Sequence, residues 1–245
     1  MYQPTPTNRG KPIRHGDFDT LCDALDYAAL CKTGFNFFDG RAKLKESLTY
    51  SELRIKALAL AKRLVPFATK NSRIGLAAVS TPEFAIIFMA CQYAGLVPAP
   101  LPLPVTLGGR NSYERQLQRL ADTGDFHALF CPDSMKQIMG SALNDMAIPV
   151  ISFEDLVTLP NGNKLRPFDK NDLCYIQYSS GSSSSPKGII GTQASVSANC
   201  HAITKFGMEM DDNDRGTSWL PLYHDMGLIG FMLAPIMSQM TVDYI

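Results

Sequence analysis

Apolar residues recur along the chain in two periods, one typical of helices and one typical of buried strands. Helical spacing runs from Leu53 to Leu64, behind Ser51 as the expected N-cap, and Pro66 is expected to end this helix. Three further helices are predicted, at residues 21–29, 81–93 and 113–121. The helix at 81–93 carries both a start and an end signal, because Pro82 stands in its first turn and Gly95 follows its end. In the helix at 113–121, Leu117 and Leu120 lie on one face.

Short apolar runs typical of strands separate these helices, at residues 35–38, 74–79, 127–131, 149–151 and 173–178. Strands that are apolar on both faces and alternate with helices of about 10–15 residues are typical of βαβ units, in which helices cover both faces of a parallel sheet. The proline-rich stretch 97–104 is predicted to be an extended connector or edge segment, because proline restricts itself and the residue before it. The pattern therefore predicts an α/β fold.

Residues 159–172 are rich in turn formers and form the best candidate for a linker. They would join two possible subdomains, 1–160 and 172–245. We find no internal repeat, and the serine cluster at 179–185 is the one low-complexity stretch.

Composition narrows the class of protein. The 245 residues include 23 basic and 23 acidic side chains, and this zero net charge argues against nucleic acid or an anionic membrane as a partner. The six cysteines contain no CxxC pair, so neither a zinc site nor a disulfide framework is expected and a reducing compartment fits. The N-terminus lacks an apolar signal region, and the longest apolar runs fall short of the roughly 20 residues that cross a bilayer. We expect a cytoplasmic protein without a membrane span.

A loop rich in serine and glycine, YSSGSSSSPKG at 178–188, lies between two strand patterns. Backbone N–H groups, hydroxyls and the ammonium of Lys187 are suited to a polyphosphate. The spacing differs from the GxxxxGK[ST] pattern of P-loop NTPases. A flexible linker is the alternative, but linkers seldom interrupt a sheet between adjacent apolar strands.

Three segments resemble motifs of the adenylate-forming superfamily, which includes acyl-CoA synthetases and fatty acyl-AMP ligases. They are the loop itself, SWLPLYHDMGLI at 218–229, and LTYSEL at 48–53. The wording of the second motif, together with VPAPLPLP at 97–104, is most similar to the N-terminal part of fatty acyl-AMP ligases and long-chain acyl-CoA synthetases. The loop departs from the family at Ser179 and Ser184, where threonine is usual, but a hydroxyl is kept.

The resemblance implies a site and a reaction. A fatty carboxylate would attack the α-phosphorus of ATP, giving acyl-adenylate and pyrophosphate, with Mg²⁺ bridging nucleotide oxygens. Lys187 and His224 would be the catalytic residues, the first steadying pyrophosphate and the second orienting the carboxylate. The ATP phosphates would be held by Ser179, Ser180, Gly181, Ser182, Ser183, Ser184, Ser185, Lys187 and Gly188. The acyl substrate would contact His224, Asp225, Met226, Gly227 and Gly230.

Alternatives remain for several of these residues. Asp225 is also a natural cap for a helix that begins at Met226. Gly227 and Gly230 allow the close approach of a ligand or, equally, of another backbone. Methionines near 226–240 are core filler unless the resemblance holds. The acidic turn at 211–214 lacks the spacing of a calcium loop and is expected to be a solvated turn.

The family's adenine-binding Tyr-Gly-x-Thr-Glu segment, with its Mg²⁺-binding glutamate, does not occur in these residues. We therefore expect 1–245 to be a partial N-terminal domain of the ligase, catalytically incomplete and inactive alone, with the principal metal ligand elsewhere. Expected partners are a fatty acid and an acyl carrier protein or a polyketide or peptide synthase module. An acyl-CoA synthetase and a degenerate, non-catalytic binding module are the alternatives.

Overall fold

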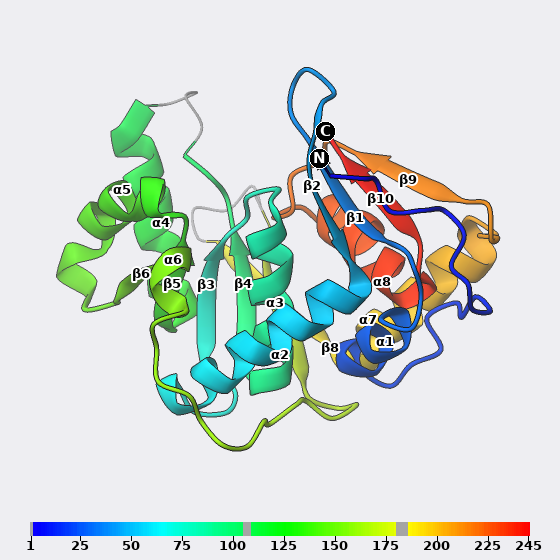
Figure 1. The fold of residues 1–245 in the computed structure, drawn as a ribbon. Helices are drawn as coiled ribbons and strands as arrows, with labels where there is room; N and C mark the ends of the chain where they lie inside the picture. Colours follow the sequence, from blue (N-terminus) through cyan, green and yellow to red (C-terminus); the bar gives the residue numbers. More distant parts are fainter. Residues whose placement is uncertain (1, 105–108, 180–185) are drawn as a thin grey trace.

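The computed structural model describes residues 2–104, 109–179 and 186–245 and contains two larger sheets and one hairpin, with helices packed around them (Figure 1). The strands are β1 (Gly34–Phe38), β2 (Leu44–Thr49), β3 (Arg73–Ala77), β4 (Val97–Leu101), β5 (Phe126–Cys131), β6 (Val150–Ser152), β7 (Leu173–Ser179), β8 (Lys187–Thr192), β9 (Arg215–Ser218) and β10 (Thr241–Tyr244). The α-helices are α1 (Leu21–Ala28), α2 (Tyr50–Phe67), α3 (Pro82–Ala94), α4 (Gly109–Gly124), α5 (Asp133–Leu143), α6 (Phe153–Leu156), α7 (Gln193–His201) and α8 (Ala234–Ser238). A 3₁₀ turn η1 (Asn144–Met146) and two π-helical segments, η2 (Ala202–Gly207) and η3 (Met226–Leu233), complete the list.

The predicted parallel sheet is confirmed in the order β4-β3-β5-β6, with every neighbouring pair parallel. Its two faces pack into different clusters. Ile74 and Leu76 of β3 join the apolar residues of α2 and α3, whereas Ala77 and the residues of β4 join α4 and α5. Strand β4 contains both Pro98 and Pro100 and lies at the edge of the sheet, where a missing N–H leaves no gap in the ladder. Of the two states expected for 97–104, the edge strand is confirmed for 97–101.

The second sheet has the order β2-β1-β10-β9 and draws strands from both ends of the chain. Strand β1 pairs antiparallel with β2 and parallel with β10, which in turn pairs parallel with β9. Phe35 of β1 meets the rings of Tyr50 and Tyr244 at centroid distances of 5.2 and 5.5 Å. The segment 159–172 carries no helix or strand, and this sheet joins residues from both sides of it. The division into subdomains at this segment stays a prediction.

Helix α2 corrects one prediction in detail. Its N-cap is Thr49 rather than Ser51, and the Thr49 hydroxyl and the Glu52 carboxylate form a capping box. Pro66 lies inside the last turn, so the helix ends at Phe67. The expected features of α3 are confirmed, with Pro82 in the first turn and Gly95 following at φ +70°. Within the described residues, no helix is long and apolar enough to cross a bilayer.

Candidate functional site

The antiparallel hairpin β7–β8 carries the described part of the phosphate-loop motif. Ser179 ends β7 and lies opposite Lys187, the first residue of β8, and Gly188 lies opposite Tyr178. Lys187 and Gly188 are exposed. The predicted phosphate ligands from Ser180 to Ser185 lie outside the described residues. The strand before the loop and the strand after it are thus confirmed as expected from the sequence.

A hydrogen bond joins this hairpin to the second motif. The side-chain amide of Gln177, which is only 8% exposed, donates from Nε2 to the carbonyl oxygen of Tyr223 at 3.1 Å. Tyr223 precedes His224, and the two rings lie 4.5 Å apart between centroids. The structure therefore brings the two motifs together, although they are 46 residues apart at this contact. Gln177 carries no signal of a functional site in the sequence, because it falls on an apolar strand pattern and belongs to neither motif.

His224 and Asp225 lie in the turn that begins η3, and both are exposed. The His224 N–H donates to Pro221 O at 3.1 Å, which closes the turn. The Asp225 carboxylate accepts a hydrogen bond from the backbone N–H of Met226 at 2.7 Å. Asp225 therefore occupies the helix-cap position that the sequence suggested for it, while its exposure leaves the other carboxylate oxygen open to a ligand.

The two glycines of this motif have different surroundings. A Cβ on Gly227 would lie 2.2 Å from the carbonyl oxygen of Pro221, so Gly227 is a close packing contact between η3 and the turn before it. A Cβ on Gly230 would meet only the Cγ of Met226, at 3.9 Å. Of the two alternatives that the sequence left open, backbone packing describes Gly227, and Gly230 borders open space.

That open space is a cavity of about 570 Å³ between the π-helical segments η2 and η3 and strand β9. Methionines and other apolar side chains dominate its wall, and its polar residues include Asp225 of the second motif. The lining residues are Asn199, Ile203, Met208, Met210, Asp214, Arg215, Gly216, Asp225, Met226, Ile229, Gly230, Phe231 and Met240. Short π-helical stretches are rare and are frequent at functional sites. Three of the five predicted substrate contacts, Asp225, Met226 and Gly230, line this one cavity.

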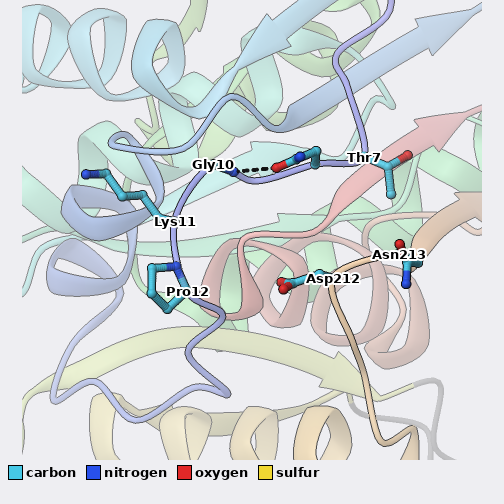
Figure 2. Close-up of a pocket in the computed structure, with 7 residues that line it drawn as sticks. Thr7, Gly10, Lys11, Pro12, Asp212 and Asn213 are labelled. Carbon is cyan, nitrogen blue, oxygen red and sulfur yellow. Dashed lines mark hydrogen bonds between the residues drawn. The ribbon is translucent and has the colours of Figure 1, made fainter.

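A second, polar cleft of about 760 Å³ lies between residues 7–12 and the acidic turn, where Lys11 and Pro12 stand across from Asp212 and Asn213 (Figure 2). Arg9 of the same N-terminal segment is 1% exposed and donates to Ser238 O at 3.0 Å and to Asp211 O at 2.8 Å. These bonds fasten the N-terminal segment to the body of the protein. The cleft contains none of the predicted site residues.

Burial raises the pKa of two phenols on the hairpin and of one nearby thiol. Desolvation raises the pKa of the Tyr178 phenol to about 12 and raises the pKa of Tyr175 further. Both phenols therefore stay neutral at pH 7. All six cysteines are buried free thiols, and burial raises the pKa of Cys200 to about 12, so this thiol is not a nucleophile. In the part of the chain that the structure describes, no group of three or more His, Cys, Asp or Glu side chains is arranged to hold a metal ion.

The chain is similar to known proteins both in sequence and in structure. A putative acyl-CoA synthetase from Caulobacter vibrioides is 42% identical over 244 residues, which are 98% of this chain and 42% of the relative. A medium-chain-fatty-acid–acyl-carrier-protein ligase from Moorena producens is 30% identical, over 91% of this chain and 39% of its own length. A solved structure from studies of fatty acyl-adenylate ligases of E. coli and L. pneumophila superimposes with a TM-score of 0.92 at 42% identity, over 95% of this chain and 42% of that one.

The chain thus spans about two fifths of the length of the relatives that it matches. The AMP-binding enzyme family matches residues 28–245, which include both motifs, the hairpin and the cavity. The structure has the α/β architecture of the N-terminal domain of adenylate-forming enzymes, as the sequence resemblance implied. The chain belongs to the AMP-binding enzyme family.

Proposed function

We propose that this chain is part of a ligase that activates a fatty acid with ATP, forming an acyl-adenylate and releasing pyrophosphate. One observation carries the proposal. The hydrogen bond from Gln177 to Tyr223 joins the hairpin that carries Lys187 to the turn that carries His224, and an apolar cavity opens beside that turn. A cation near a polar turn and an apolar cavity fits a substrate with an anionic head and an aliphatic tail.

Each group has a role that follows from its chemistry. The ammonium of Lys187 offsets negative charge on the leaving pyrophosphate, and the serines and Gly181 of the loop donate hydrogen bonds to phosphate oxygens. The His224 imidazole donates to the carboxylate or to the charge that develops on the α-phosphate. ATP would supply the adenylyl group, and Mg²⁺, when bound, would offset the negative charge of the phosphates. Its principal protein ligand would come from residues outside this chain.

The cavity between η2 and η3 is the part of the site that suits the acyl tail. Methionine side chains are flexible and polarisable and adapt to an alkyl chain of variable shape. Each methylene buried there contributes about 0.8 kcal/mol. The polar residues Asp225 and Asn199 belong to the same wall, so a fatty acid would find both apolar and polar surface within one cavity.

The test of the phosphate site is a calorimetric titration of the 245-residue chain with inorganic pyrophosphate. We expect binding by the wild type and at least about tenfold weaker binding by Lys187→Ala, because one charged hydrogen-bond partner is worth about 1.5–3 kcal/mol. Lys170→Ala is the matched control, since Lys170 lies just before β7 and pairs with Asp19 at 2.7 Å. Equal heats for wild type and Lys187→Ala would reject the assignment.

We further propose that these residues alone do not complete the reaction. With ATP, Mg²⁺ and a long-chain fatty acid, the 245-residue chain should release no significant pyrophosphate, and clear turnover would refute this statement. A degenerate homologue that has lost the phosphate site would bind no pyrophosphate. The calorimetric titration therefore distinguishes this alternative from part of a catalytic family member.

The acceptor of the acyl group defines a second candidate function. The name of the Caulobacter relative favours transfer to CoA, and the name of the Moorena relative favours an acyl carrier protein. We propose the carrier protein, either free or within a polyketide or peptide synthase module, because the structure with a TM-score of 0.92 comes from studies of fatty acyl-adenylate ligases. Product analysis of the longest protein that contains this chain tests this choice: acyl-CoA formed in the presence of CoA would favour the alternative.

A further inference from the structure

The hairpin that carries Lys187 contains one extra residue near its base. Leu173 lies opposite Thr192 and Tyr175 lies opposite Gly191, so Cys174 has no partner in β8. Such a bulge leaves backbone groups of the extra residue unpaired and determines the register of every pair that follows it. In this hairpin, the pairs that follow end with Ser179 opposite Lys187.

Two buried glutamines occupy the base of the hairpin. Gln92 of α3 is fully buried, and its Nε2 donates to the carbonyl oxygen of the extra residue, Cys174, at 2.8 Å. Gln193, 1% exposed, directly follows β8 and donates from Nε2 to Gln92 Oε1 at 2.8 Å and to Leu173 O at 3.3 Å. Its Oε1 accepts from the N–H of Leu21 at 3.0 Å, at the start of α1.

This pair of amides satisfies groups that water cannot reach. A buried carbonyl or N–H without a partner costs about 1–3 kcal/mol, so the native register is favoured over any register in which Cys174 O turns away from Gln92. A shift of one residue would also turn each side chain of β8 to the other face of the hairpin, including that of Lys187. Because Gln92 lies on α3, its hydrogen bond ties the register of the hairpin to a helix that packs against the parallel sheet.

We propose that Gln92 and Gln193 are positioning residues that hold the bulge at Cys174 and thereby fix where Lys187 stands relative to β7. The register part of this inference is independent of catalysis, and its consequence for phosphate binding rests on the proposed function.

The experiment compares Gln92→Met with Gln118→Met. Both changes replace an amide by an apolar side chain of similar length, and Gln118 Nε2 donates to Ala142 O at 2.9 Å between α4 and α5, far along the chain from the hairpin. Register is measured by NMR, from the cross-strand NOEs that link Gln177 to Ile189 and Tyr178 to Gly188. Pyrophosphate affinity is measured by calorimetry on the same samples.

We expect Gln92→Met to lose these NOEs or to show a second set, and to bind pyrophosphate at least about tenfold more weakly than wild type. Gln118→Met should keep both. Unchanged NOEs in Gln92→Met would overturn the inference, and changed NOEs with unchanged affinity would overturn its link to Lys187. If Gln92→Met does not fold, Gln193→Asn, which withdraws the amide by one methylene, is judged by the same two outcomes. Absence of pyrophosphate binding by wild type would refute the proposed function, and the NOEs would still decide the role of the glutamines.

Discussion

Gly227 and Gly230 lie three residues apart on η3. The structure predicts that the same substitution to alanine changes the free energy of unfolding in opposite directions at the two positions. In Gly227→Ala, the new Cβ would lie 2.2 Å from Pro221 O and 2.8 Å from Pro221 C, whereas ordinary contacts begin at 3.4 Å. Backbone atoms cannot rotate away, so η3 or the turn must move by roughly 1 Å. Overpacking costs about 1–3 kcal/mol, and a clash with backbone atoms lies in the upper part of that range, about 2–3 kcal/mol. Removing a helical glycine regains about 0.5–1 kcal/mol, which leaves a net loss of about 1–2.5 kcal/mol.

In Gly230→Ala, the new methyl group meets only Met226 Cγ at 3.9 Å, so the gain of about 0.5–1 kcal/mol stands without the cost. The two variants should therefore differ by roughly 2–3 kcal/mol in the free energy of unfolding. Urea titrations followed by circular dichroism measure this difference, and equal slopes would show that the denatured states are comparable. A Gly227→Ala protein as stable as wild type, or a Gly230→Ala protein less stable than Gly227→Ala, would refute the reasoning.

Three further predictions concern helix α2, the N-terminal segment and the cavity beside Gly230. Thr49→Ala should cost about 1 kcal/mol at pH 7 by removing the capping box. Because hydrogen bonds from Thr49 lower the pKa of Glu52 below 4.5, this loss of stability should shrink as the pH falls from 4.5 through the folded-state pKa. Urea titrations measure the loss, and a loss that does not change with pH would contradict the prediction. Arg9→Met should cost about 2–3 kcal/mol, because Ser238 O loses its buried donor, and a change below 0.5 kcal/mol by thermal unfolding would be inconsistent with that role. Gly230→Leu should occupy part of the cavity and weaken binding of a fluorescent long-chain fatty acid by about tenfold, without affecting the binding of pyrophosphate. An unchanged fatty-acid affinity would place the tail elsewhere.

The periodicity of the sequence was sufficient for the parallel sheet and most of its helices. The apolar strands of that sheet are buried on both faces, and α3 begins and ends at residues with strong local preferences, Pro82 and Gly95. The N-cap of α2 could also have been found, since Thr49 and Glu52 have the spacing of a capping box. Ser51 is also a good N-cap residue by type, but it lies within the first turn of the helix.

Other elements had weaker signals. Strand β2 contains Lys45, Glu46 and Ser47 at half-exposed or exposed positions, so it lacks an apolar pattern. The insertion of β10 between β1 and β9 depends on contacts between residues more than 200 positions apart, as Phe35 with Val242, which local patterns do not encode. The helix expected to begin at Met226 is present, but its first part, η3, is π-helical and borders the cavity. Its apolar sequence has no periodicity that distinguishes a π-helix from an α-helix.

The candidate site shows the same division. Motif wording predicted roles for Lys187, His224 and the glycines, because the proposed chemistry requires particular residue types at those positions. The residues that hold those motifs in place are amides on apolar elements. Gln177 spans from the hairpin to the turn, and Gln92 and Gln193 hold the base of the hairpin. These amides donate hydrogen bonds to backbone carbonyl groups that the fold would otherwise leave unpaired. The sequence does not show which carbonyl groups these are, because that depends on the register of the strands.

The candidate site has two halves, the hairpin β7–β8 and the turn before η3, and different interactions hold each of them. The hairpin depends on buried amide hydrogen bonds at its base, whereas the turn before η3 depends on the contact between Gly227 and Pro221. These two contacts share no partner, and sites without shared partners usually combine additively within about 0.3–0.5 kcal/mol. Gln177, however, touches both halves through Tyr223. If the site acts as one unit, a change at Gln177 must couple to changes in either half, while Gln92→Met and Gly227→Ala should affect stability independently of each other.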